Sequence, residues 1–96
     1  MVKHIVFTKL KDNSMENKAK LVEVFMSMKG KVPQIVDIKA GEDFGCTERS
    51  YDVALEVVVK DRQALTDYAN DEYHCSVVKK YVHDNRTASA IVDYEF

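Results

Sequence analysis

The sequence predicts an α+β fold, in which a ferredoxin-like split βαβ unit forms a four-stranded antiparallel sheet. Two observations predict it. The hydrophobic pattern changes several times between the two-residue period of strands and the period of about 3.6 residues of helices. The order along the chain is strand, helix, strand, strand, helix pair, strand, which is the order of that fold. A chain of 96 residues suffices for one core, so we expect a single domain over residues 1–96.

The first part of the chain predicts a strand and then a helix. Residues 2–10, VKHIVFTKL, alternate as a strand does and carry apolar groups on both faces. The segment 13–16, Asn-Ser-Met-Glu, offers a capping side chain with a glutamate three positions on. Gly30 and Pro33 supply the stop signal, so we expect a helix over about residues 14–29. The apolar residues at helical spacing are Met15, Ala19, Val22, Phe25 and Met26.

The rest of the chain predicts two more strands, two helical segments and a final strand. Residues 34–44 have a less regular strand pattern, and residues 51–60, YDVALEVVVK, alternate most clearly. Asp61 can cap a short helix that ends before Asn70-Asp71-Glu72. A second helical segment follows, and residues 87–96 form the last strand. The apolar sides of the two segments are Ala64, Leu65, Tyr68 and Ala69, and then Val77, Val78, Tyr81 and Val82.

Composition excludes several classes of protein. Fourteen basic and 16 acidic residues give a net charge of −2, without the basic face that nucleic acid requires. Charged residues interrupt the apolar stretches of the N-terminal segment, so we expect no signal peptide and no membrane partner. We therefore expect a cytoplasmic location. Cys46 and Cys75 are far apart and lack metal-site spacing, so we expect free thiols. A metal site built from His4, His74 and Asp71 would lack close ligand spacing, and we predict no metal.

Both faces of the predicted sheet are apolar. In the first strand, Ile5 and Phe7 lie opposite the face that carries Val2 and Val6. When helices cover one side of an antiparallel sheet, the other side is normally polar and exposed to solvent. We therefore expect a homodimer through the open sheet face, in which two sheets close an eight-stranded barrel. A monomer with an apolar sheet surface is the alternative.

Several segments together resemble one family. They are the opening VKHIV with residues 9–12, Pro33 before the second strand, residues 51–55, the segment 68–74, and residues 91–94, IVDY. Their order and spacing are similar to those of the stress-responsive A/B barrel domain family over nearly the whole chain. The resemblance implies a homodimeric α/β barrel with the two sheets facing each other.

The resemblance also implies site residues. A plant member of this family, olivetolic acid cyclase, closes a linear polyketide by an intramolecular aldol condensation without a cofactor. Its catalytic Tyr and His lie six residues apart, and Tyr68 and His74 fall on that pair. His4 falls on a strand histidine of the same pocket, and Phe25 on an aromatic wall, so these two are expected to bind substrate. Many members read His-Pro-x-His where this chain has DEYH at residues 71–74.

The same residues can be interpreted without the family. Asp71 lies where a helix N-cap belongs, and His74 then lies in the first turn, where the helix dipole disfavours the imidazolium form. A neutral His74 can accept a proton, while Tyr68 donates a hydrogen bond to a carbonyl oxygen. The alternative is purely structural, with His74 in a cap and Tyr68 in the core.

Two functions follow from these alternatives. The first is a cofactor-free, cyclase-like enzyme that acts on a small carbonyl compound. The second is a non-catalytic dimeric barrel that binds a hydrophobic small molecule or has a structural role in stress.

Overall fold

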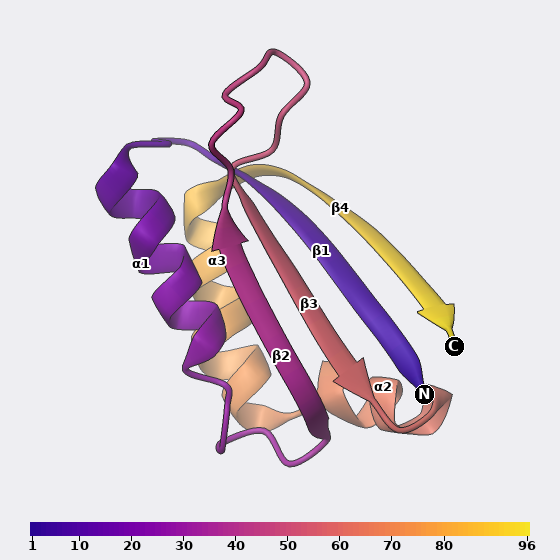
Figure 1. Ribbon diagram of the computed structural model, residues 1–96. Helices are drawn as coiled ribbons and strands as arrows, with labels where there is room; N and C mark the ends of the chain where they lie inside the picture. The colour runs from indigo at the N-terminus through magenta and orange to yellow at the C-terminus, as the bar shows by residue number, and fades with distance from the viewer.

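The computed structural model describes residues 1–96 and confirms the ferredoxin-like α+β fold (Figure 1). None of the helices is both long enough and apolar enough to span a bilayer. The elements are β1 (Val2–Leu10), α1 (Met15–Met26), β2 (Ile35–Glu42), β3 (Val53–Val59), α2 (Arg62–Ala69), the π-helical segment η1 (His74–Lys79), α3 (Lys80–Asn85) and β4 (Arg86–Glu95).

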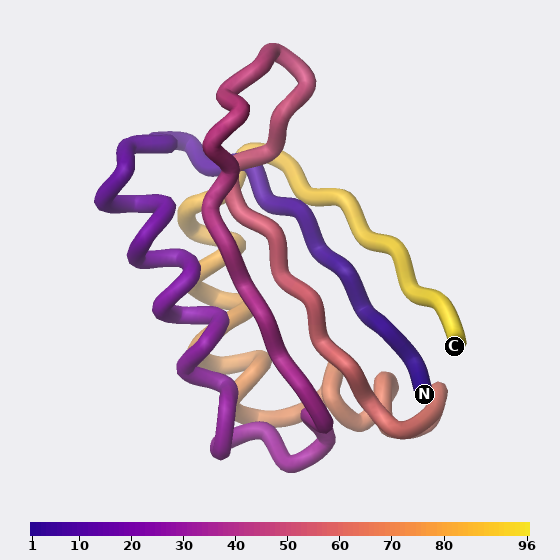
Figure 2. Tube along the Cα trace, in the orientation of Figure 1, coloured from indigo at the N-terminus to yellow at the C-terminus, as the bar shows by residue number.

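The four strands form one antiparallel sheet in the order β2-β3-β1-β4. The two central strands, β1 and β3, come from distant parts of the chain, and β4 returns beside β1 (Figure 2). The helices all lie on one face of this sheet, and the opposite face is left uncovered (Figure 1). The loop between β2 and β3 extends beyond the end of the sheet.

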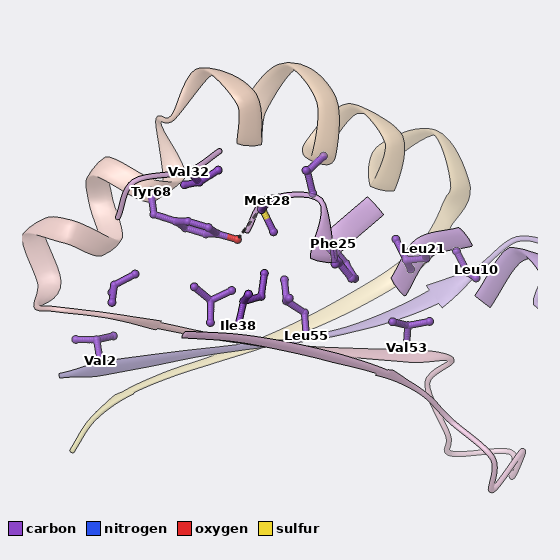
Figure 3. Packing of buried hydrophobic residues seen from close by; sticks show 13 residues of the cluster. Val2, Leu10, Leu21, Phe25, Met28, Val32, Ile38, Val53, Leu55 and Tyr68 are labelled. Atoms are coloured by element: carbon purple, nitrogen blue, oxygen red, sulfur yellow. Dashed lines mark hydrogen bonds between the residues drawn. The ribbon is translucent and has the colours of Figure 1, made fainter. Parts of the chain in front are cut away.

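The core lies between the sheet and the helices (Figure 3). The face of β1 that carries Val2 and Thr8 meets the helices, as the strand pattern allows, and both side chains are buried. The face that carries Ile5 and Phe7 is the open one, because the alternation of a strand sends neighbouring residues to opposite sides. The buried hydrophobic residues are Val2, Leu10, Leu21, Phe25, Met28, Val32, Ile38, Val53, Leu55, Val57, Val59, Tyr68 and Val78.

The first helix begins at Met15 and differs from the prediction in its cap. Ser14 is the N-cap, and its hydroxyl accepts a hydrogen bond from the backbone N–H of Asn17 at 3.3 Å. The third helical position is therefore Asn17 and not the predicted Glu16. The helix ends at Met26, and Gly30 at φ +81° completes the stop, because only glycine enters the left-handed region without strain.

The buried face of α1 was predicted only in part, since Phe25 is buried and Val22 and Met26 pack against the core, but Met15 and Ala19 are exposed. Met15 is 83% exposed, whereas Lys18, Leu21, Phe25 and Met28 are buried. Two apolar stripes run side by side on this helix, and the spacing alone does not select between them. The Lys18 ammonium group, which contacts the carbonyl oxygen of Asp43 at 3.4 Å, is covered by the loop after β2.

Three aspartates fix turns by accepting hydrogen bonds from backbone N–H groups. The Asp61 carboxylate accepts a hydrogen bond from the N–H of Ala64 at 2.8 Å, which confirms the predicted cap of α2. Asp71 does the same for the N–H of His74 at 3.1 Å. The buried Asp52 carboxylate accepts a hydrogen bond from the N–H of Leu10 at 2.8 Å and joins the end of β1 to the start of β3. The Asp61 and Asp71 contacts lie in the segment that carries α2 and η1, whereas the Asp52 contact lies at the opposite end of the sheet, since Val2 pairs with Val59 and Thr8 with Val53.

Candidate functional site

A pocket of about 740 Å³ opens between the sheet and the segment that runs from α2 to α3. Half of its 18 lining residues are hydrophobic, as in most small-molecule sites. His4, Phe25, Tyr68 and His74 all line it. The structure therefore brings together in one pocket the four residues that the sequence analysis selected from distant segments.

Tyr68 lies at the centre of the cluster. Its ring lies between two imidazoles, with ring centroids 4.3 Å from His74 at an interplanar angle of 30° and 5.6 Å from His4 at 62°. The three side chains come from α2, η1 and β1. Tyr68 is only 1% exposed, so its ring is held by the core and lies in contact with both imidazoles.

The Tyr68 hydroxyl points toward Met28, a buried core residue that does not line the pocket. It donates to the Met28 thioether at 3.8 Å, and Figure 3 shows the oxygen directed toward that side chain. Burial raises the pKa of Tyr68 well above its usual range, and the negative charge of Asp71 raises it further. The phenol therefore stays protonated at neutral pH. Since a thioether is a weak acceptor, the O–H group remains available to a stronger one.

His74 begins the π-helical segment η1, directly after the turn capped by Asp71. Burial lowers the pKa of His74, and the electrostatic influence of Lys79 and of His4 also lowers it. The Ala69 carbonyl and the Asp71 carboxylate act in the opposite direction. The Nδ1 atom is buried and has no hydrogen-bond partner. Burial is the largest of these effects, so it favours the neutral imidazole at pH 7.

His4 is paired with Asp93, which the sequence analysis missed as a site residue. His4 Nδ1 and Asp93 Oδ1 form a short contact, and the two residues lie opposite each other in the register of β1 and β4. An imidazole that donates from Nδ1 keeps Nε2 as an acceptor. The signal in the sequence was that Asp93 lies two positions after Ile91 and so on the same face of the last strand. Both residues line the pocket.

Phe25 closes one side of the pocket with an apolar ring. It lies on the buried face of α1 and is 3% exposed. The pocket therefore combines an apolar wall with the polar side chains of Tyr68, His4 and His74, whose rings are in contact.

No group of three or more His, Cys, Asp or Glu side chains is arranged to hold a metal ion. Cys46 and Cys75 are both free and exposed, and neither lines the pocket described above.

A family model matches almost the whole chain. The model is that of the stress responsive A/B barrel domain, and it covers residues 2–96. No curated protein sequence matches the chain.

Solved structures share the fold over almost their whole length. A dimeric protein of unknown function from Bacteroides fragilis has 27% identity and a TM-score of 0.81, with 99% of this chain and 95% of that chain covered. A protein from Arabidopsis thaliana has 17% identity and a TM-score of 0.85, with 100% and 95% covered. A hydroxynitrile lyase from Passiflora edulis has 16% identity and a TM-score of 0.80, with 97% and 90% covered.

Proposed function

Because the chain belongs to the stress responsive A/B barrel domain family, we propose that its pocket is the active site of a cofactor-free, cyclase-like enzyme. The substrate is a small carbonyl compound. His74 is the general base, and Tyr68 is the hydrogen-bond donor to the carbonyl oxygen. The observation that carries the proposal is the 4.3 Å stacking of a neutral, buried imidazole on a protonated phenol inside a pocket of about 740 Å³.

The chemistry follows from the state of these two groups. His74 removes a proton from the carbon next to the carbonyl, and the electrons of the C–H bond form an enolate, whose oxygen accepts a hydrogen bond from Tyr68. The enolate carbon attacks a second carbonyl of the same molecule and forms a C–C bond. The proton on His74 then passes to the new alkoxide, so the reaction is an isomerisation that consumes nothing else.

The other site residues have supporting roles in this proposal. His4, oriented by Asp93, contacts the substrate near the same oxygen, because its ring lies at the edge of Tyr68. Phe25 provides an apolar wall for the carbon chain. A preorganised site of this kind is what holds the reacting atoms close together.

The test measures the first step alone and does not require the natural substrate. Purified protein in D₂O is mixed with alkyl and aryl ketones whose α-protons exchange slowly, and NMR follows deuterium incorporation. We expect His74→Gln to lower the catalysed rate by about 10²–10⁴-fold and Tyr68→Phe by about 10²–10³-fold. The matched control is Tyr73→Phe, since that hydroxyl contacts Ser27 Oγ at 2.8 Å outside the pocket. Wild-type rates in both site variants would refute the assignment.

A second candidate function is binding of a hydrophobic small molecule without chemistry. One observation favours it: the Tyr68 hydroxyl already has Met28 as a partner on the core side. In that case ketones and alkanes of similar size would bind equally well, and no α-proton would exchange in any of them.

We also propose that the chain forms a homodimer through the open face of its sheet. Several large apolar side chains are exposed there, among them Phe7, Val92 and Tyr94, and such patches mark interaction surfaces. The similar Bacteroides fragilis protein is described as dimeric. The pocket lies on the opposite face of the sheet, so this association leaves it accessible. Two exposed free thiols are compatible with the reducing cytoplasm that we infer as its location.

A further inference from the structure

Basic side chains gather at the mouth of the pocket. Lys79, Lys80, His83 and Arg86 line it, whereas the one acidic lining residue, Asp93, is already paired with His4. The whole chain carries a net charge of −2, so this concentration of positive charge is opposite in sign to the rest of the molecule. A cleft lined by one sign of charge attracts ligands of the other sign.

Two of these cations have no carboxylate partner. Asp84 lies 3.7 Å from Lys80 Nζ and so offsets its charge, and it also lies 3.6 Å from His83 Nδ1. Arg86 instead donates to the neutral Ser89 hydroxyl at 2.7 Å, which fixes its guanidinium group at the pocket. No carboxylate lies within 4.0 Å of Lys79 or Arg86.

The π-helical segment is what brings Lys79 to the pocket. His74 and Lys79 are the first and last residues of η1, five positions apart. In an α-helix such residues differ in direction by about 140°. The i to i+5 repeat of a π-helix returns them to the same side, and both line the pocket. The positive charge of Lys79 is close enough to lower the pKa of His74. The free cation and the proposed base therefore face the same space.

We infer that the pocket takes an amphipathic ligand with an anionic head group, a carboxylate or a phosphate, which Arg86 and Lys79 bind at the mouth. The apolar body extends inward past Ile91 toward Phe25. The inference deepens the proposed function and rests on it for the position of the reacting carbonyl, which lies beside Tyr68 and His74. Guanidinium and ammonium groups suit this role because charge-assisted hydrogen bonds to carboxylates and phosphates are stronger than neutral ones.

The test compares probes of equal chain length that differ only in the head group. Calorimetry measures binding of octanoate, octyl phosphate and 1-octanol to the wild-type protein and to variants. We expect at least one anion to bind the wild type more tightly than octanol, by about 10- to 100-fold. Arg86→Gln and Lys79→Gln should each remove a large part of this preference. Tighter binding of octyl phosphate identifies a phosphate head, and tighter binding of octanoate identifies a carboxylate.

Two controls separate the possible causes. Unchanged octanol binding by Arg86→Gln shows that the pocket is still folded, and Lys29→Gln removes an exposed cation that does not line the pocket. Equal affinities for octanol and both anions, or full anion binding in both pocket variants, would overturn the inference. His74→Gln should keep anion binding. If it does so while the wild type exchanges no ketone proton, the proposed chemistry fails and anion recognition stands.

Discussion

Replacing Tyr68 by phenylalanine or by alanine separates its role in the core from its role in chemistry. Tyr68→Phe removes one oxygen atom, whose single partner is the Met28 thioether at 3.8 Å. Tyr68→Ala removes the whole ring from a position that is 1% exposed and stacked against His74. The first change leaves the packing of the core intact, and the second creates a cavity.

The two changes differ widely in their expected cost. A net hydrogen bond contributes about 0.5–1.5 kcal/mol, and a thioether acceptor belongs at the low end, so Tyr68→Phe should lower the free energy of unfolding by about 0.5 kcal/mol. Deleting a buried aromatic ring costs about 3–5 kcal/mol, a large fraction of the roughly 5–15 kcal/mol that stabilises a domain. Loss of a hydrogen-bond donor to a developing oxyanion costs about 10²–10³-fold in rate.

Urea unfolding and deuterium exchange on the same protein samples test this reasoning. We expect Tyr68→Phe to unfold almost as the wild type does but to lose exchange activity, and Tyr68→Ala to be strongly destabilised. A Tyr68→Phe protein that is destabilised as much as Tyr68→Ala would show that the hydroxyl is a structural group. A Tyr68→Phe protein with full activity would show that it is not the donor.

Three further predictions concern pH, the sheet end and the open face. Burial lowers the pKa of His74, whose ordinary value is 6.5. Below pH 6.5 the unfolded chain therefore takes up a proton at His74 that the folded protein does not, and the free energy of unfolding decreases as the pH decreases. Thermal melts from pH 7.5 to 5 should show a smaller loss in His74→Gln than in the wild type, and equal losses would contradict this origin. Asp52→Ala leaves the N–H of Leu10 without its partner and should lower the free energy of unfolding by about 1–3 kcal/mol, whereas the exposed control Asp67→Ala should change it little. Phe7→Glu puts a charge on the open face and should convert the proposed dimer to a monomer in light scattering; a dimer mass that this change leaves unaltered would exclude that face as the interface.

The fold was predictable because its signals are local. Alternation in residues 2–10 and 51–60, the stop at Gly30, and the cap at Asp61 each depend on backbone geometry within a few residues, and the structure confirms all four. The buried face of α1 was not predictable in the same way. Lys18 is buried because the loop after β2 covers it, and that loop lies about 25 positions further along the chain.

The sequence by itself determined the order of elements and the apolar character of both sheet faces, and its resemblance to a family implied that Tyr68 and His74 form a pair. Only the tertiary structure decided that His4 pairs with Asp93, because that contact depends on the register between two strands at opposite ends of the chain. It also decided that Lys79 faces the same pocket as His74, since this follows from a π-helical repeat that hydrophobic periodicity does not specify. Local patterns fix which elements form, whereas strand register and helix winding fix which side chains meet.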